Sequence, residues 1–161
     1  MISSAKKIIG VKELKARLSS LRRQGKAIAF TNGCFDLMHL GHVTYLQKAK
    51  KGDRILVVGV NSDKSISRIK GPSRPICAQR SRAAVLAALS CVDFVVIFNE
   101  ETPYNLIKAV CPDVLIKGAD WKGKKVIGSD IAKKVELIKY VNGFSTTKII
   151  EKIAKTHGCS S

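Results

Sequence analysis

Short apolar runs alternate along this chain with segments in which apolar residues recur at helical spacing. We expect buried strands in the apolar runs, at residues 26–32, 54–63, 92–98, 112–118 and 135–141. We expect helices in the periodic segments between them, at residues 11–24, 40–51, 81–90, 101–110 and 145–155. The alternation predicts an α/β fold, a Rossmann-like three-layer sandwich in which helices cover both faces of a five-stranded, mostly parallel sheet.

The stretches between these elements contain turn-forming residues. Residues 62–75, with their Ser, Gly and Pro, are expected to form a loop, and residues 119–134 a loop with a short helix. Thr102 is expected to cap the helix that follows it, with Pro103 in the first helical position.

Length and composition fit a single folded domain. The 161 residues can bury a sizeable core, and 45% of them are hydrophobic. No repeat or linker divides the chain, so we expect one domain over residues 1–161, with a core at about 8–153 and a flexible tail at 156–161. No apolar run approaches the roughly 18 residues that span a bilayer, and the N-terminus lacks the apolar region of a secretory signal. A cytoplasmic protein is therefore expected.

The cysteines do not form a disulfide or zinc pattern. They are odd in number and widely spaced, at Cys34, Cys77, Cys91, Cys111 and Cys159. Such spacing predicts reduced thiols. The three histidines and the scattered acids contain no dense cluster, so no metal site built by the protein itself is expected.

Charge is the unusual feature of the composition. Lys and Arg number 29 against 12 acidic residues, which gives a formal net charge of +17. Such a balance attracts polyanions, whether nucleic acid, an acidic membrane surface or phosphorylated small molecules. The lysines are spread along the chain without interleaved aromatic residues, which disfavours a nucleic-acid-binding module. We expect phosphorylated small molecules as partners, and neither nucleic acid nor a membrane, although such substrates do not account for so many surplus lysines.

The stretch TNGCFDLMHLGHVTYL, residues 31–46, lies where the first expected strand meets a helix. In parallel sheets, ligands bind beyond the carboxyl ends of the strands. Free amides at such a turn and the positive end of the next helix suit an anion, and Gly33 and Gly41 leave room for one. His39 and His42 are three residues apart, so both imidazoles would lie on one face of the helix start. There they can donate hydrogen bonds to phosphate oxygens and stabilise charge during phosphoryl-type transfer.

The segment GCFDLMHLGH resembles the GxFDxxHxGH motif of the cytidylyltransferase-like nucleotidyltransferases. Four further stretches resemble the adenylyltransferase domain of the bifunctional heptose-phosphate enzymes, in order and over about residues 8–153: GVNSDKSISRIKGPSRP, RAAVLAALSCVDFVV, DVLIKGAD and GFSTTKIIEKI. The resemblance implies that a sugar 1-phosphate attacks the α-phosphate of ATP, which is bound with Mg²⁺. Pyrophosphate is released and an ADP-sugar is formed, without a covalent enzyme intermediate.

The resemblance also implies roles for individual residues. Those expected to act in catalysis, or to clamp the phosphates, are His39, His42, Lys70 and Arg82. Those expected to contact the nucleotide are Thr31, Asn32, Gly33, Cys34, Phe35, Asp36, Gly41, Lys117, Gly118, Asp120, Ser145, Thr146 and Thr147. Those expected to contact the acceptor are Asn61, Asp63 and Arg74. Asp36 would orient the histidines or a metal-bound water, or else simply cap a helix; Ser145 would cap the last helix whether or not phosphate binds there.

Two departures from the family pattern and one further resemblance keep the substrates open. Ser81 stands where many relatives carry an acid, and residues 128–137 are shorter than the heptose-enzyme pattern. KGADWKGKKV, residues 117–126, also resembles a run in glycerol-3-phosphate cytidylyltransferase. ADP-heptose synthesis is therefore the first hypothesis, and CTP with glycerol 3-phosphate or a related phospho-alcohol is the alternative. The heptose enzymes usually carry a kinase domain ahead of this one, so a separate sugar kinase is expected, and relatives suggest a homodimer.

Overall fold

A computed structural model describes residues 4–139, 141 and 143–158. Its sheet has five strands in the order β3-β2-β1-β4-β5, and every ladder is parallel. The strands are β1 (Ile28–Gly33), β2 (Ile55–Asn61), β3 (Phe94–Phe98), β4 (Val114–Gly118) and β5 (Lys134–Ile138). The α/β class and the five-stranded sheet predicted from the sequence are confirmed.

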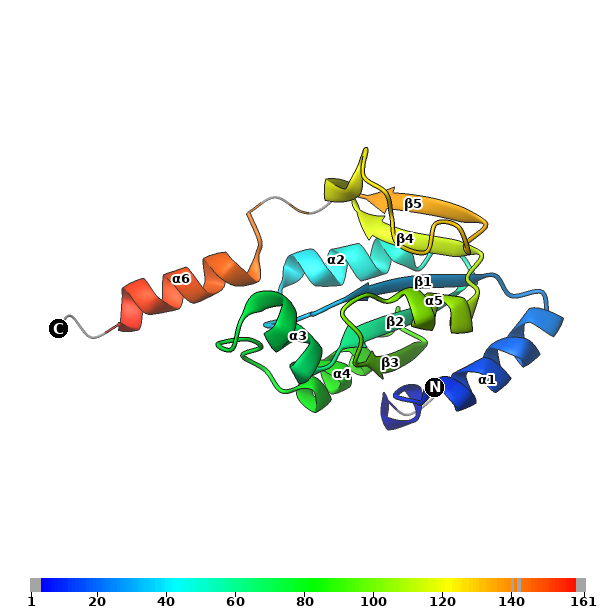
Figure 1. The fold of residues 1–161 in the computed structure, drawn as a ribbon, viewed down its shortest axis with the longest axis horizontal. Coiled ribbons are helices and arrows are strands. Elements are labelled where there is room, and N and C mark those ends of the chain that lie inside the picture. The colour runs from blue at the N-terminus through cyan, green and yellow to red at the C-terminus, as the bar shows by residue number, and fades with distance from the viewer. Residues whose placement is uncertain (1–3, 140, 142, 159–161) are drawn as a thin grey trace.

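Helices connect the strands and cover the sheet (Figure 1). The α-helices are α1 (Val11–Arg23), α2 (Leu40–Ala49), α3 (Asp63–Lys70), α4 (Gln79–Ala88), α5 (Tyr104–Val110) and α6 (Thr146–His157). Two short 3-10 helices are η1 (Ser4–Lys7) and η2 (Ala119–Trp121). None of these helices, within the described part of the chain, combines the length and apolar character that crossing a bilayer requires.

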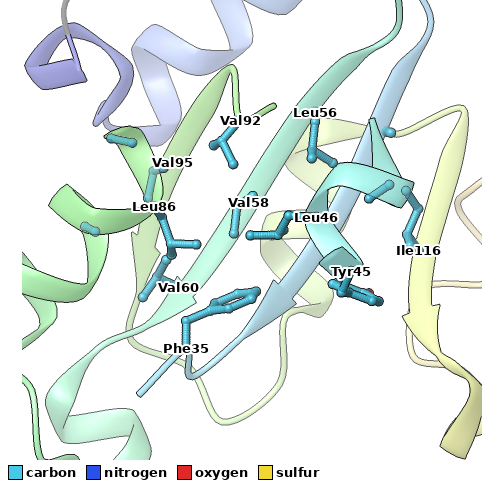
Figure 2. Close-up of a cluster of buried hydrophobic side chains, with 14 of the residues drawn as sticks. Phe35, Tyr45, Leu46, Leu56, Val58, Val60, Leu86, Val92, Val95 and Ile116 are labelled. Carbon is cyan, nitrogen blue, oxygen red and sulfur yellow. The ribbon is translucent and has the colours of Figure 1, made fainter. Parts of the chain in front are cut away.

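Two apolar clusters, one on each face of the sheet, form the core. In β1, Ala29 belongs to one cluster and Phe30 to the other, because neighbouring strand residues point to opposite faces. Leu46 of α2 and Leu86 of α4 pack on the first face, where Figure 2 shows them against the valines of β2. Leu14 of α1 packs on the second face, where α5 also lies. The three-layer arrangement therefore follows from strands that are apolar on both sides.

The sequence prediction was wrong at α3. Residues 62–75 were expected to form a loop, but Ser62 caps a helix and its hydroxyl accepts a hydrogen bond from the amide of Ser65, at 3.1 Å. Ile66 is buried under that helix, and Gly71 ends it with a φ of +94°. Serine favours helix N-termini as well as loops, and composition alone did not separate the two cases.

Smaller differences occur at other element ends. Pro103, not Thr102, is the N-cap of α5, and no side chain caps that helix. The last helix continues through His157, so the expected tail is helical in part, and residues 159–161 lie outside the described residues. The strand expected at 135–141 ends at Ile138, and Tyr140 also lies outside the described part.

The strand order creates a switch point. After β1, the chain builds β2 and β3 on one side and then crosses to build β4 and β5 on the other. The connections leave the carboxyl ends of β1 and β4 in opposite directions, so these neighbouring ends open onto a crevice. The motif at residues 31–46 starts at this edge of the sheet.

Candidate active site

A cavity of about 280 Å³ lies at the carboxyl ends of β1 and β4. Its walls come from the two strand ends, the motif loop, α2, α3, η2 and the first turn of α6. The lining residues are Asn32, Gly33, Cys34, Phe35, Asp36, His42, Tyr45, Ile66, Lys70, Arg74, Lys117, Gly118, Trp121, Thr146 and Thr147. Among the described residues, cations and hydroxyls therefore outnumber the single carboxylate in this wall, as binding of an anion requires.

Two stacked histidines stand at the start of α2. His39 is the N-cap of α2. The centroid of its ring lies 3.9 Å from the centroid of the His42 ring, and the two ring planes make an angle of 22°. The Nδ1 atoms of both rings are buried, and neither has a hydrogen-bond partner among the described residues. The pKa of His42 is lowered to about 4, mainly because the ring is buried and also because His39 and Lys70 lie nearby. Burial also lowers the pKa of His39. Both imidazoles are therefore neutral near pH 7 and retain bonding capacity for a ligand.

Gly41 allows this stacking. A Cβ at this position would lie 3.0 Å from the Cε1 and Nδ1 atoms of His39 and 3.4 Å from the Cβ of Phe144. The space over the glycine is thus filled by the chain itself, whereas the sequence suggested that it was reserved for a ligand. Phe144 also stacks on His39, with 6.4 Å between ring centroids.

The motif loop has a strained backbone. Phe35 and Leu37 both have φ angles of +48°, in the left-handed region that non-glycine residues seldom adopt. The Phe35 side chain is buried, and its ring lies 5.4 Å from that of His42 (Figure 2 shows Phe35 against the core). Packing of this kind holds a loop in a conformation that it would not otherwise favour.

Asp36 anchors the loop between α3 and α4. Its carboxylate accepts hydrogen bonds from the amides of Ile76 and Cys77, both at 2.9 Å, and from Nη1 of Arg74 at 3.1 Å. Burial alone would raise the pKa of this carboxyl, but these donors lower it. Asp36 is thus ionised, and it ties the motif to a segment 40 residues further along the chain. It does not cap a helix.

Arg82 is a second anchor. Its guanidinium is almost fully buried and donates to the carbonyls of Cys34, Cys77 and Asn61, and to the carboxylate of Asp63. All four acceptors belong to the protein, and the side chain does not line the cavity. In this conformation Arg82 holds the motif loop, β2 and the start of α4 together.

Lys117 places an amino group in the cavity wall from β4. Its Nζ donates to Oδ1 of Asn32 at 2.5 Å and lies 5.3 Å from the centroid of the Trp121 ring. Burial lowers the pKa of Lys117 to about 8, although Asp120 opposes this shift. The ammonium group is therefore mostly charged at neutral pH and only weakly compensated, which favours an anionic ligand.

The first turn of α6 forms another part of the wall. Ser145 caps the helix and accepts a hydrogen bond from the amide of Lys148 at 3.2 Å. Thr146 donates to the carbonyl of Asp36 at 2.6 Å, which joins the start of α6 to the motif. Thr147 lines the cavity with Thr146.

Of the predicted site residues, the structure brings twelve into the cavity wall and leaves eight outside it. The twelve are Asn32, Gly33, Cys34, Phe35, Asp36, His42, Lys70, Arg74, Lys117, Gly118, Thr146 and Thr147. The eight are Thr31, His39, Gly41, Asn61, Asp63, Arg82, Asp120 and Ser145.

Several of the residues outside the wall support it from behind. Thr31 is buried and shares a 2.8 Å hydrogen bond with the hydroxyl of Tyr45. Asn61 donates to Ser65 at 3.0 Å, and Asp63 accepts from Arg82. Their side chains are therefore engaged by neighbouring protein groups.

Three lining residues were not predicted: Tyr45, Ile66 and Trp121. Tyr45 lies three residues beyond His42 on α2, so helical spacing could have identified it. Trp121 belongs to the quoted stretch 117–126, but nothing in the sequence alone placed its ring beside Lys117.

A resident metal ion does not fit these residues. Among the described residues, no group of three His, Cys, Asp or Glu side chains could hold one. Asp36 supplies the carboxylate of the wall, and it is already engaged by Arg74 and two amides.

Comparison with known proteins identifies the class to which this fold and site belong. The cytidylyltransferase-like family matches residues 30–161, and the chain belongs to that family. It is therefore a nucleotidyltransferase.

Curated relatives narrow the comparison. The chain is 59% identical over 141 residues to the bifunctional protein HldE of a Nitratiruptor species, a match that covers 88% of this chain and 30% of that protein. It is 56% identical over 144 residues to the bifunctional protein HldE of a Helicobacter pylori strain, covering 89% of this chain and 31% of that protein. The chain thus spans less than a third of the length of these relatives.

Two solved structures are also similar. A lipopolysaccharide core biosynthesis protein from Thermoplasma volcanium is 29% identical with a TM-score of 0.57, and the match covers 71% of this chain and 96% of that one. Pantoate-beta-alanine ligase from Francisella tularensis, solved with a nucleotide and beta-alanine, has a TM-score of 0.60 at 17% identity, over 92% of this chain and 77% of that one. The second likeness shows the shared fold alone.

Proposed function

We propose that this chain transfers AMP from ATP to a sugar 1-phosphate, D-glycero-D-manno-heptose 1-phosphate, and forms ADP-heptose and pyrophosphate. The observation that carries the proposal is the pair of stacked imidazoles at the start of α2, with buried nitrogens that lack partners among the described residues, beside an anion-binding cavity. The similarity to HldE proteins, and to a protein of lipopolysaccharide core biosynthesis, supports the choice of a heptose acceptor.

The chemistry needs no covalent intermediate. A phosphate oxygen of the sugar attacks the α-phosphorus of ATP, a new P–O bond forms, and the bond to the β-phosphate oxygen breaks as pyrophosphate leaves. His42 donates a hydrogen bond to the α-phosphate and stabilises the charge that builds there, and His39 holds its ring by stacking. Lys70, Arg74 and Lys117 attract and orient the anionic groups.

Mg²⁺ bound to the triphosphate would neutralise part of its charge. The hydroxyls of Thr146 and Thr147, at the positive end of α6, suit the outer phosphates. ATP and the sugar phosphate are therefore the proposed partners, and we propose that the chain that binds them forms a homodimer. We place this reaction in the cytoplasm, where ATP is available.

The alternative is transfer of CMP from CTP to glycerol 3-phosphate or a related phospho-alcohol. One observation supports this alternative. Trp121 lines the cavity and lies against Lys117, and it belongs to the stretch that resembles glycerol-3-phosphate cytidylyltransferase. An aromatic ring at this position can contact a base or an acceptor of either kind.

A panel of substrates tests the proposal. ATP and CTP are each combined with heptose 1-phosphate and with glycerol 3-phosphate, and pyrophosphate release is measured. ATP with heptose 1-phosphate is expected to give the highest kcat/KM. A preference for CTP with glycerol 3-phosphate would establish the alternative, and no release with any pair would overturn both.

A further inference from the structure

The last helix, α6, is amphipathic and is not packed into the core. Figure 1 shows it projecting from the sheet towards the C-terminus, and none of its 12 residues is buried. Ile149 and Ile150 are half-buried, whereas Ile153 is 53% exposed. At about 100° per residue these three side chains fall on one side of the helix. Among the described residues, the fold therefore covers this apolar face only in part, and leaves Ile153 exposed.

The opposite side of α6 is basic. Lys148, Lys152 and Lys155 follow one another at spacings of four and three residues, and so form a continuous stripe. Glu151 is the one acid of the helix. The helix thus carries a positive stripe opposed to an isoleucine face, in a chain whose net charge is +17.

Within the described part of the chain, α6 is attached to the body through its N-terminal half. Thr146 donates to the carbonyl of Asp36, and residues 151–158 are all exposed. The helix is held at the edge of the active-site cavity, and it is exposed from Glu151 onwards. Its apolar face is thus accessible to a flat surface that approaches from outside.

We propose that α6 is an interfacial helix that docks this protein on an anionic lipid bilayer. A helix with an isoleucine face and a lysine stripe lies in the plane of such a surface, with its apolar side chains among the lipid tails and its cations near the headgroups. The sequence led us to expect no membrane partner, because no segment spans a bilayer; a helix that lies on the surface needs no spanning length. Docking also uses surplus positive charge that small anionic substrates do not require.

Other occupants fit these observations less well. A homodimer formed through another surface would leave α6 uncovered, and a single helix of 12 residues offers far less than the roughly 800 Å² per partner that a stable dimer buries. Nucleic acid would match the lysines but leave the isoleucine face unused. An anionic bilayer is complementary to both sides of the helix.

Vesicle binding tests the proposal on the full chain. We expect the protein to sediment with vesicles of phosphatidylcholine mixed with phosphatidylglycerol. We expect it to stay in the supernatant with vesicles of phosphatidylcholine alone. Raising the salt from about 0.1 M to about 1 M shortens the Debye length from about 10 Å to about 3 Å, and should weaken the binding. Equal recovery with both kinds of vesicle, or none with either, overturns the proposal.

Two matched variants separate the helix face from general surface charge. Ile153→Asn places a polar group in the exposed apolar face and is expected to lower the partition coefficient about tenfold or more. Val85→Asn makes the same kind of change at a residue of α4 that is 45% exposed, and is expected to bind like the parent. Circular dichroism and turnover in vesicle-free solution should be unchanged in both.

Binding that Ile153→Asn leaves intact would show that charge elsewhere is responsible, and would overturn the role of α6. The proposal is also overturned if the parent chain sediments as a dimer in the ultracentrifuge and the Ile153→Asn variant sediments as a monomer. A second copy of the chain would then cover the apolar face.

Discussion

The two ends of the parallel sheet differ in how their polar groups are partnered. At the carboxyl end, the buried Nδ1 atoms of His39 and His42 have no partner among the described residues. At the amino end, Lys26 pairs with Asp53 and Lys133 with Asp113, both at 2.7 Å.

The amino end is organised around Glu136. Arg54 lies 3.1 Å from its carboxylate, Lys134 3.0 Å and Lys51 3.5 Å. Burial would raise the pKa of Glu136, but Lys134 and Arg54 lower it to about 2. Nη2 of Arg54 is the one buried side-chain nitrogen at this end that lacks a partner in the described structure. The amino end therefore uses its charges to hold the fold, whereas the carboxyl end, besides its anchors Asp36 and Arg82, keeps hydrogen-bonding capacity for a ligand.

Replacing His42, whose Nδ1 atom has no partner among the described residues, should change turnover more than any other substitution considered. His42→Ala should lower turnover by about 100-fold or more, because charge stabilisation at the α-phosphate is lost. His157→Ala, an exposed histidine of α6, is the matched control and should retain parental turnover. Pyrophosphate release measures both, with circular dichroism to confirm folding. Near-normal release by His42→Ala would contradict the proposed role.

Breaking the Asp36 anchor should have an intermediate effect. In Asp36→Asn an amide group replaces a carboxylate oxygen that faces N–H donors, so the loop carrying Ile76 and Cys77 should shift. We expect turnover to fall about tenfold through misplacement of the cavity wall. Hydrogen exchange at the Ile76 and Cys77 amides should become faster. Unchanged exchange would show that the carboxylate does not hold the loop.

The control for this variant is Asp130→Asn. Asp130 is an exposed acid that accepts a hydrogen bond from the Tyr104 hydroxyl at 3.0 Å, away from the cavity. In the Asp130→Asn variant, turnover and the rate of amide exchange at residues 76 and 77 should match those of the parent.

At the amino end, a substitution should change stability and leave turnover alone. Glu136→Gln leaves the buried guanidinium of Arg54 without its counter-charge, and should lower the free energy of unfolding by about 1–2 kcal/mol. Glu13→Gln, which breaks an exposed pair with Arg17 on α1, should stay within about 0.5 kcal/mol of the parent. Urea unfolding and pyrophosphate release check the two properties. A loss of turnover in Glu136→Gln would mean that the two ends are coupled.

The pH dependence of stability should also differ between the two ends. His42 has a pKa of about 4 in the folded protein and 6.5 as its ordinary value, so the unfolded chain binds more protons between these values. Its contribution to stability is complete above about pH 6.5 and is lost as the pH falls towards 4. Glu136 contributes above its ordinary pKa of 4.5 and loses that contribution as the pH falls towards 2.

Urea unfolding at a series of pH values tests this separation. His42→Gln should flatten the dependence between pH 6.5 and 4, and Glu136→Gln should change it only below about pH 4.5. A parent curve that is flat above pH 4.5 would contradict the depressed pKa of His42.

Local pattern was sufficient to predict most of the fold. Strand β2 is apolar on both faces, and α1 places Leu14 and Leu18 one turn apart, so each element carries its own signal. The loop assignment at α3 failed because Ser62 and Gly71, which begin and end that helix, are also common turn residues. The last helix was predicted from its periodicity, but not that its apolar face would remain uncovered.

The site could be predicted only in part, and the limit lies in sequence distance. His39 and His42 are three residues apart, so spacing alone predicted that both rings lie on one face of the helix start, and in the structure they stack. Asp36 and Arg82 contact segments that are 38 to 48 residues away, and their positions as anchors depend on how several loops return to one edge of the sheet. The pairing of Lys117 with Asn32 joins residues 85 positions apart in the same way.

The alternation of strands and helices, the cytidylyltransferase-like motif and the charge could all be predicted from the sequence, because each depends on residues close together along the chain. Which polar groups are partnered depends instead on the tertiary fold. Burial and long-range contacts give Arg82 four protein acceptors and leave the Nδ1 atoms of His39 and His42 with none in the described structure. Whether a buried polar group supports the fold or waits for a ligand depends on its neighbours in space, and those neighbours come from distant parts of the chain.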